Sequence, residues 1–358
     1  FVATKEASSY AAILGILKAG GAYVPLPSEG PPARWASMLD QACVQAIVGD
    51  AVQEGLVPIS SEEGRGSPQG YPVGAEAYVL FTSGSTGGPK GVSVSRANVA
   101  AYLAHQGSAY DCNEHDRFSQ FFALTFDLSV HDLFLCWSVG ACLCVPSAED
   151  MLRAVAFARN EGITVWFSVP SLAMLMQRTR ALSKSALPDV RLAFFCGEPL
   201  TWSVAHAFRV AASEARLINL YGPTEATIAI SAYELERDTG EANTVPIGTV
   251  FSGSAGRVVN DELQVSGPQL AAGYVGHADA TQRAFITDAG VRWYRTGDQV
   301  RIDADGVLHF VSRIDDQVKV MGHRVEPAEV DAVLGPVVRG NVITLPRHDA
   351  ERGRLSTS

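Results

Sequence analysis

The glycine-rich stretch at residues 82–91, TSGSTGGPKG, constrains this chain more than any other part of its sequence. Glycine permits positive φ and a close approach to the backbone, and successive N–H groups in such a turn form a concavity that binds anions. Strand patterns flank the stretch at residues 78–81 and 92–95. A glycine loop held between two strands favours a phosphate-binding site over a flexible linker, and Lys90 adds a mobile positive charge.

The stretch is not a P-loop. That motif requires Gly-Lys-Ser/Thr at the entry to a helix, whereas Lys90 lies between Pro89 and Gly91 and a strand pattern follows. Pro89 also removes one backbone donor. The sequence therefore predicts a different kind of phosphate-holding loop.

Composition limits the class of protein. The chain has 358 residues, 47% of them hydrophobic and 18% charged, which predicts one large domain and a smaller one. A formal net charge of -10 argues against nucleic-acid and anionic-membrane partners. The six cysteines show no C-x-x-C pair or metal-ligand spacing, and the apolar run at 121–145 contains Asp127, His131 and Asp132. We expect a reduced, cytoplasmic setting, with no membrane span.

Helical and strand patterns alternate through the first two thirds of the chain. Helices are predicted at residues 8–19, 34–42, 97–105, 151–160, 171–177 and 203–214, and strands at 22–26, 46–48, 118–122, 164–167, 190–196 and 217–220. Residues 53–73 are predicted to form a surface loop. The alternation predicts an α/β fold with helix-covered, largely parallel sheets. Ligands in such sheets bind beyond the carboxyl ends of strands, where Gly197, Glu198 and Tyr221 fall.

The pattern changes near Val258 to short strands separated by turns. Strands are predicted at residues 263–265, 293–294, 300–302 and 308–311, with a hairpin turn at 303–306. A helix is predicted at 325–334. The predicted architecture is thus a large N-terminal domain with a β-rich subdomain, followed by a small, apparently truncated α+β C-terminal subdomain.

Four further motifs carry polar groups suited to chemistry. They are NLYGPTEAT at 219–227, WYRTGD at 293–298, FDLSVHD at 126–132 and SRIDDQVKVMGHRVEPAEV at 312–330. Each has a plain structural alternative when taken alone. The first two fit ordinary turns, Asp127 fits a helix N-cap, and Arg313 and Lys319 fit a solvated face.

Taken with the glycine loop, these motifs resemble those of the adenylate-forming superfamily, in particular the amino-acid adenylation domains of non-ribosomal peptide synthetases and D-alanine–carrier-protein ligases. The resemblance covers residues 11–334 approximately. It implies a large part at 1–314 that holds the ATP and amino-acid site. Residues 315–358 would begin a mobile C-terminal subdomain, with Asp315 as the hinge.

The resemblance implies ATP and Mg²⁺ as the cofactors. Tyr221 would stack on adenine, Thr224 would touch the α-phosphate, Glu225 would hold Mg²⁺, and Asp298 would bind the ribose. The implied catalytic residues are Lys90, Thr224, Glu225 and Lys319, the last on the face that meets a carrier's thiol arm. The implied ATP contacts are Thr82, Ser83, Gly84, Ser85, Thr86, Gly87, Lys90, Gly197, Glu198, Asn219, Tyr221, Gly222, Thr224, Asp298 and Arg313.

The resemblance also implies an amino-acid pocket. Its residues would be Asp127, Leu128, His131, Phe167, Phe194, Cys196, Leu220, Ile228 and Ala229. Asp127 aligns with the carboxylate that pairs with the substrate's α-ammonium, which aryl and fatty-acyl relatives lack. His131 would line the wall and not act as a base. The other walls are apolar, so a small neutral substrate is expected, with alanine ahead of serine, glycine and valine.

The implied activity is ATP-dependent formation of an aminoacyl-adenylate, followed by transfer to the phosphopantetheine thiol of a carrier protein. An acyl- or aryl-CoA ligase, and a nucleotide-binding module without turnover, are the alternatives. The sequence departs from the superfamily at Ser312, where glycine is usual. The stretch at 257–263 is also short. No Asn-Gly-Lys setting for the family's late catalytic lysine occurs before Ser358.

Overall fold

The computed structural model describes residues 1–48, 57–59, 75–83, 88–235, 243–320, 323–327, 330–331, 334, 344, 346–349 and 354–357. Gly84, Ser85, Thr86 and Gly87 of the predicted phosphate loop lie outside the described residues, as does most of the predicted loop at 53–73. None of the described helices combines the length and apolarity needed to cross a membrane.

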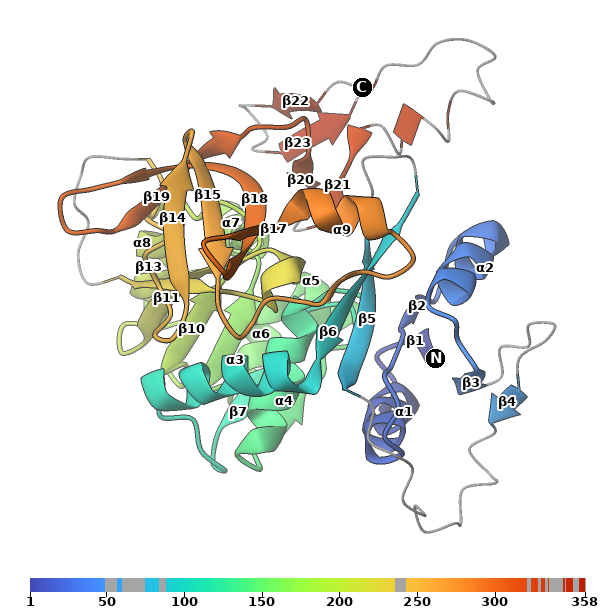
Figure 1. Cartoon of the computed structure of the whole chain (residues 1–358). Helices are drawn as coiled ribbons and strands as arrows, with labels where there is room; N and C mark the ends of the chain where they lie inside the picture. Colours follow the sequence, from blue (N-terminus) through green and yellow to red (C-terminus); the bar gives the residue numbers. More distant parts are fainter. Residues whose placement is uncertain are drawn as a thin grey trace.

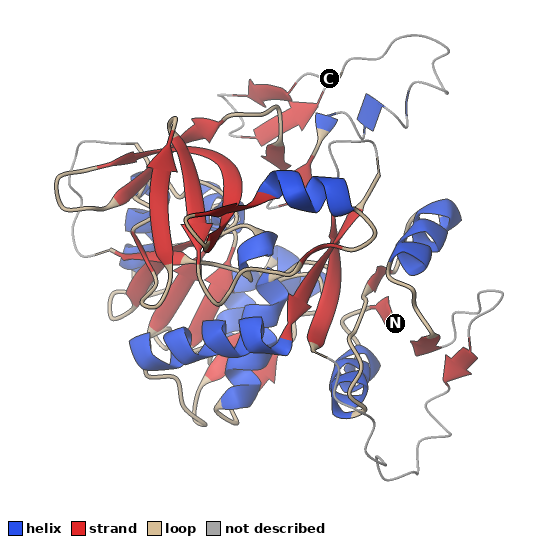
Figure 2. Ribbon diagram, viewed as in Figure 1, coloured by secondary structure: helices blue, strands red, loops and turns tan. Residues whose placement is uncertain are grey.

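Figure 2 shows the helices in blue. They are α1 (Ala7–Lys18), α2 (Pro32–Gln41), α3 (Arg96–Ala109), α4 (Leu128–Ser138), α5 (Ala148–Leu152), α6 (Ala154–Asn160), α7 (Pro170–Arg178), α8 (Trp202–Ala211), α9 (Ala278–Ala284) and the 3₁₀ turn η1 (Thr224–Ala226). A helix is found at each place predicted before residue 215, and two helices, α4 and α9, were not predicted. Ser95 caps α3 as predicted, because its hydroxyl accepts from the Asn98 N–H at 3.1 Å. The helix predicted at 151–160 is instead two helices, since Arg153 leaves the helical region at φ -123°, ψ 42°.

A seven-stranded sheet forms the centre of the fold (Figure 1). Its spatial order is β13 (Thr249–Val250), β12 (Ser231–Glu234), β11 (Arg216–Tyr221), β10 (Leu192–Phe195), β9 (Val165–Ser168), β7 (Arg117–Ser119) and β8 (Cys142–Cys144). The five strands from β11 to β8 are parallel, and β12 and β13 are antiparallel additions. The prediction of a largely parallel, helix-covered sheet is confirmed here.

Alternate side chains of the central strands pack on opposite faces of this sheet. Val165 and Phe167 join the apolar cluster that contains Leu128 of α4. Trp166 joins the other cluster, together with Phe208 of α8. Strands buried on both faces must be apolar at nearly every position, which is why these segments read as short continuous apolar runs.

The strands beside the glycine loop form a different, antiparallel sheet. Its order is β16 (Gly273–Tyr274), β6 (Lys90–Ser95) and β5 (Glu76–Thr82). Strands β5 and β6 pair with Thr82 opposite Lys90. The two ends of the predicted phosphate loop are therefore clamped side by side, as the flanking strand patterns suggested.

The β-rich subdomain is a five-stranded antiparallel sheet. Its strands are β14 (Ala255–Val259), β15 (Glu262–Ser266), β18 (Val291–Ile302), β17 (Phe285–Asp288) and β19 (Leu308–Arg313), the last paired with β18. The strands predicted at 293–294 and 300–302 are parts of the single strand β18. The polar residues between the two predicted segments suggested a break in the strand. The strand continues there because β18 pairs with β15 from Tyr294 to Gln299. The predicted turn at 303–306 does join a hairpin, β18 to β19.

Four short two-stranded pairings complete the described part: β1 (Val2–Ala3) with β2 (Leu26–Pro27), β3 (Ala46–Val48) with β4 (Val57–Ile59), β20 (Val318–Val320) with β21 (His323–Val325), and β22 (Pro346–Asp349) with β23 (Arg354–Thr357). The strand predicted at 22–26 is reduced to β2, although Tyr23 forms a bridge to Tyr78. Most of the helix predicted at 325–334 lies outside the described residues.

A partly buried ion pair lies at the amino ends of the inner strands β7, β9 and β10; the side chain of Asp116 is 3% exposed and that of Arg191 is 36% exposed. Asp116 accepts from the Arg191 guanidinium at 2.8 and 2.5 Å and from the Thr164 hydroxyl at 2.7 Å. Burial raises the pKa of Asp116, but its hydrogen bonds to Arg191 and Thr164 outweigh that effect and leave it lowered. Asp116→Asn should therefore destabilise the fold by about 1–3 kcal/mol, because it removes charge-assisted hydrogen bonds while Arg191 remains partly solvated. Urea unfolding at pH 7 measures this loss, and an unchanged midpoint would contradict it.

Candidate active site

A cavity lies where the central sheet meets the β-rich subdomain. Its lining comes from the start of α4, the segment after β10, the turn after β11 and the strands β18 and β19, and consists of Phe126, Asp127, Leu128, Cys196, Gly197, Gly222, Pro223, Thr224, Thr296, Asp298, Arg313 and Gln317. We call this the central cavity. It lies beyond the carboxyl ends of parallel strands β10 and β11, where the fold class predicts a ligand. Eight predicted site residues line it, six from the four motifs and two, Cys196 and Gly197, from the segment after β10.

Asp127 stands at the entry to α4 and is 5% exposed. Its side chain makes no capping hydrogen bond to that helix. Asp127 thus occupies the N-cap position of α4, but its side chain does not cap the helix. A buried carboxylate on the wall of a cavity suits recognition of a cationic group.

Tyr221, Asp298 and Arg313 form a hydrogen-bonded polar group at the wall of the cavity that β18 and β19 provide. The Tyr221 hydroxyl donates to Asp298 Oδ2 at 2.5 Å, and Arg313 Nη1 donates to Oδ1 at 2.8 Å. Burial, and then the charge of Asp298, raise the pKa of Tyr221 far above its usual value, so the hydroxyl keeps its proton. Each carboxylate oxygen still has a second lone pair, and Asp298 can accept further hydrogen bonds from a ligand.

Two glycines permit the close contacts of this wall. Gly297 has φ +69°, and a Cβ there would lie 2.5 Å from Arg313 Nη2. At Gly222 a Cβ would lie 2.5 Å from the Ala229 Cα. Both distances are shorter than real Cβ contacts allow, so any larger residue would displace a wall of the cavity.

Glu225 is fully buried next to the cavity-lining Thr224. Its Oε1 accepts from the Tyr274 hydroxyl at 2.6 Å. The Lys90 ammonium lies 5.7 Å from the centre of the Tyr274 ring, a cation–π contact. Tyr274 therefore joins the predicted metal residue to the predicted phosphate-loop lysine, although 135 residues separate them in sequence.

Glu225 is also the residue that bears on the implied Mg²⁺. In the part of the chain that the structure describes, no group of three or more His, Cys, Asp or Glu residues is placed to hold a metal alone. A single carboxylate fits Mg²⁺, because this ion commonly binds one or two carboxylates and takes its other ligands from phosphates and water.

Several predicted ATP residues lie outside the lining of the central cavity. Asn219 is 3% exposed, and its amide donates to the Pro246 carbonyl at 2.8 Å inside the sheet. Glu198 accepts from the Ser171 N–H at 2.9 Å at the start of α7. Thr82 ends β5, and Ser83 follows it. For Asn219 and Glu198 the structure thus supplies a structural role.

The predicted pocket residues His131, Phe167 and Phe194 pack together, are fully buried and are not part of the lining of the central cavity. Ring centres lie 4.5 Å apart for His131 and Phe167 and 4.9 Å apart for His131 and Phe194. His131 Nδ1 lies 2.6 Å from the Tyr102 hydroxyl, while its Nε2 has no hydrogen-bond partner among the described residues. Leu220, Ile228 and Ala229 are also buried.

The backbone at Thr227 and Ile228 is strained. Their φ values are +56° and +76°, which β-branched residues rarely adopt. Gln269 holds the segment in place: its side-chain amide donates to the Ala229 carbonyl at 2.7 Å, and its backbone carbonyl accepts from the Thr227 hydroxyl at 2.6 Å. Strain of this kind concentrates at ligand sites, and Ile228 is a predicted substrate contact.

The sequence interpretation missed several residues of this region. Four of them line the central cavity: Phe126, Pro223, Thr296 and Gln317. Each of these four stands inside one of the motifs, so the sequence offered a signal for them. Tyr274, which pairs with Glu225, and Gln269, which braces the strained turn, lie in stretches whose side chains gain meaning only through contacts distant in sequence.

His131 should make the fold sensitive to acid. Burial lowers its pKa to about 3, whereas an unfolded histidine has a pKa near 6.5. Between these values the unfolded chain binds a proton that the folded protein does not, so stability is present above about pH 6.5 and is lost as pH falls toward 3. The loss reaches at most about 1.4 kcal/mol per pH unit. His131→Phe should flatten the pH dependence of urea unfolding between pH 6 and 4; identical slopes in both proteins would exclude this role.

Comparison with known proteins identifies the class. Residues 2–275 match the family described as AMP-binding enzyme. The chain is 35% identical over 349 residues to the AMB antimetabolite synthetase AmbB of Pseudomonas aeruginosa, covering 90% of this chain and 27% of that protein. It is 31% identical to nonribosomal peptide synthetase 32 of Fusarium pseudograminearum, covering 98% of this chain and 4% of that protein. The chain therefore belongs to the AMP-binding enzyme family.

A solved structure agrees with this assignment. The adenylation domain AlmE of Vibrio cholerae, in complex with glycyl-adenosine-5′-phosphate, superposes with a TM-score of 0.87 at 30% identity, covering 98% of this chain and 77% of that one. The predicted resemblance to adenylation domains of the non-ribosomal peptide synthetase type is confirmed, and with it the prediction of a ligase. The chain spans 4% and 27% of the lengths of the two curated relatives.

Proposed function

We propose that the protein activates an amino acid with ATP, forming an aminoacyl-adenylate and releasing pyrophosphate. The observation that carries this proposal is the central cavity, which places the Asp127 carboxylate with Thr224, Asp298 and Arg313. A buried anion suits the α-ammonium of the amino acid, and the Tyr221–Asp298–Arg313 group suits a nucleoside. The bound glycyl-adenylate of AlmE supports the same pairing of ligands.

The residues act mainly by positioning and by neutralising charge. The substrate carboxylate is ionised at neutral pH and attacks the α-phosphorus without a general base. The new bond joins that carboxylate oxygen to the phosphorus, and the bond to the bridging oxygen breaks as pyrophosphate leaves. Thr224 would contact the α-phosphate, and Lys90 the phosphates beyond it.

Glu225 would hold Mg²⁺ in this reaction. The ion, when bound, neutralises phosphate charge. Release of the Glu225 carboxylate from the Tyr274 hydroxyl would free one oxygen for this purpose, and Tyr274 would then be a neighbour of both the metal site and Lys90.

The finer substrate proposal is a small neutral amino acid, with alanine first. In this proposal Phe167 and Phe194 would fill the far end of the amino-acid pocket and would leave room for a short side chain only. Serine is the nearest competitor, because the fully buried His131 Nε2 has no partner among the described residues and would accept or donate a hydrogen bond. An unpaired buried polar atom is costly, so a side-chain hydroxyl would find a ready partner there.

The second half of the proposal is transfer of the aminoacyl group to the phosphopantetheine thiol of a carrier protein. Residues 1–314 would hold the ATP and amino-acid site, and the part from 315 onward would move about Asp315. Asp315 pairs with Arg313 at 2.8 and 2.5 Å at the end of β19. A backbone rotation at Asp315 would therefore change the position of Arg313 and its ion pair with Asp298. Lys319, in β20, would meet the carrier's arm.

Amino-acid-dependent exchange of labelled pyrophosphate into ATP tests this function. The complete gene product is assayed against the proteinogenic amino acids and against aryl and short fatty acids. Highest exchange with alanine or serine is expected. Exchange with acids that lack the amine would favour an acyl- or aryl-CoA ligase, and nucleotide binding without any exchange would favour a module without turnover.

A further inference from the structure

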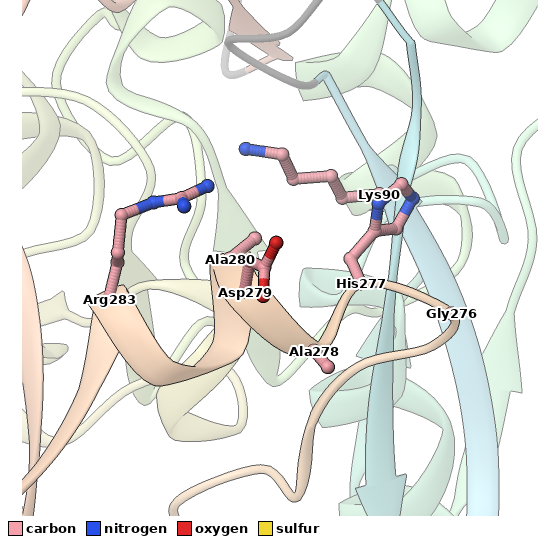
Figure 3. A pocket seen from close by; sticks show the side chains of 7 residues that line it. All are labelled: Lys90, Gly276, His277, Ala278, Asp279, Ala280 and Arg283. Carbon is pink, nitrogen blue, oxygen red and sulfur yellow. The ribbon is translucent and has the colours of Figure 1, made fainter.

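Side chains also come together outside the central cavity. A pocket of about 370 Å³ between β6 and α9 includes Lys90 and Arg283 in its lining, and it shares Lys90 with the proposed reaction site (Figure 3). A second group is separate from the residues of that reaction and consists of thiols. Cys142 and Cys144 lie two positions apart on β8, and their sulfur atoms are 4.0 Å apart. We call this pair the dithiol.

The dithiol lies at an edge of the central sheet. Strand β8 ends the spatial order of the described sheet and pairs with β7. Cys142 is exposed, whereas Cys144 is 5% exposed and belongs to the apolar cluster that contains Trp166. The two thiols therefore differ in access, and an oxidant in the solvent reaches Cys142 first.

A guanidinium group lies beside the exposed thiol. Arg117 stands opposite Cys142 in the neighbouring strand, and its Nη1 donates to Cys142 Sγ at 3.6 Å. Its Nη2 pairs with Glu161 Oε2 at 2.9 Å, which holds the guanidinium in place. A basic group stabilises a neighbouring thiolate, which is the form of cysteine that attacks. Burial raises the pKa of Cys144 to about 12, so that thiol keeps its proton.

The backbone of β8 allows the two sulfur atoms to bond. Residues two apart on a strand have Cα atoms about 6.6 Å apart, near the upper end of the roughly 4.4–6.8 Å that disulfides span. The sulfur atoms would close from 4.0 Å to about 2 Å by side-chain rotation and a small bend of the strand. In the sheet as described, β8 has a neighbour on one side only, so a bend there disturbs fewer hydrogen bonds than in an inner strand.

We propose that Cys142 and Cys144 form a redox site at which hydrogen peroxide converts the dithiol to a disulfide. The Cys142 thiolate attacks one peroxide oxygen, the O–O bond breaks, and a sulfenic acid forms while the departing hydroxide takes up a proton. The Cys144 sulfur then attacks the Cys142 sulfur. The S–S bond forms, the S–O bond breaks, and the hydroxyl leaves as water with the Cys144 proton. Both sulfur atoms are oxidised, and both peroxide oxygens are reduced to water.

Thiol labelling of the complete gene product tests the proposal. The protein is treated with hydrogen peroxide, denatured, labelled with N-ethylmaleimide and digested with trypsin. The tryptic peptide 118–153 contains Cys136, Cys142 and Cys144. In the wild-type protein this peptide should take up one maleimide after peroxide and three after later reduction with dithiothreitol. In Cys136→Ala, the matched control with a buried thiol removed, it should take up none and two.

Two variants assign the roles of the sulfur atoms. Cys142→Ser should leave both remaining thiols of the peptide free after peroxide. Cys144→Ala keeps the buried position apolar and should stop the reaction at the Cys142 sulfenic acid, which dimedone captures. The internal control is Cys43, an exposed thiol whose sulfur lies 4.0 Å from the Gln41 carbonyl. It should react about tenfold more slowly than Cys142, because no basic group contacts it in the described part of the chain.

Three results would overturn the proposal. The first is full labelling of the wild-type peptide at a peroxide dose that oxidises Cys43. The second is a disulfide that persists in Cys142→Ser, and the third is one that disappears in Cys136→Ala, since either would place the bond on Cys136. The experiment requires neither ATP nor an amino acid, so its outcome is independent of the proposed function.

Discussion

Asp127→Ala is expected to abolish amino-acid-dependent pyrophosphate exchange, with kcat/KM falling by about 10²–10³-fold. The carboxylate is 5% exposed on the wall of the central cavity, and the proposed substrate brings an ammonium to the same place. Removal of one partner of a buried ion pair costs about 3–5 kcal/mol, because the other charge is left uncompensated. Exchange kinetics with the preferred amino acid measure the loss.

The control for this experiment comes from the same turn of helix. Ser129 lies two positions after Asp127, and its hydroxyl donates to the Phe126 carbonyl at 2.7 Å. Ser129→Ala removes that local hydrogen bond without changing charge and should keep kcat/KM within a few-fold. If Asp127→Ala retained amino-acid exchange, Asp127 would not bind the substrate's ammonium. The same conclusion would follow if both variants gained exchange with acids that carry no amine.

Asp298→Asn should raise the KM for ATP by about 10–100-fold and leave the KM for the amino acid nearly unchanged. The carboxylate already accepts from the Tyr221 hydroxyl and from Arg313, and the proposed ribose contacts would use its remaining lone pairs. An amide keeps the volume but loses the charge and one acceptor. Hydrogen bonds to a charged group are worth about 1.5–3 kcal/mol.

Tyr221→Phe separates the two proposed contacts of this wall. The substitution removes the hydroxyl that donates to Asp298 and keeps the aromatic face proposed for adenine. If stacking is the main role of Tyr221, the KM for ATP should change by less than about threefold. The fold should persist in both variants, because Arg313 also pairs with Asp315 and donates to the Thr296 carbonyl at 2.6 Å. A raised KM for the amino acid together with an unchanged KM for ATP in Asp298→Asn would contradict the assignment.

Local sequence predicted the elements of this fold where one physical rule governed them. The parallel strands β9 and β10 are buried on both faces, so their apolar runs were unambiguous. Ser95 could be recognised as a cap because capping depends on neighbours within three residues. The strand β18 was harder to predict as one continuous strand. Its polar middle residues are held in the strand by pairing with β15, and the local sequence gives no sign of that pairing.

The candidate site divides in the same way. Asp127, Thr224 and Asp298 stand inside compact motifs, and the fold brings all three to one cavity. Asn219 stands in such a motif too, yet its amide is engaged inside the sheet by the Pro246 carbonyl. Tyr274 and Arg283 lie in stretches without a distinctive pattern, and only the packing of β16 and α9 beside β6 places them near Lys90.

The hydrogen bonds by which Gln269 holds the strained turn at residues 227–229 limit how substrate choice can be altered. Ile228, a predicted wall of the amino-acid pocket, owes its position to a backbone that its own side chain disfavours, and Gln269 maintains that backbone from outside the pocket. Replacing Ile228 with the residue of another adenylation domain should therefore reproduce that domain's pocket shape only if the backbone turn, and the residue that holds it, are also the same in both proteins. Libraries that vary residues 227–229 together with Gln269 should yield more folded, selective enzymes than libraries that vary the pocket side chains alone.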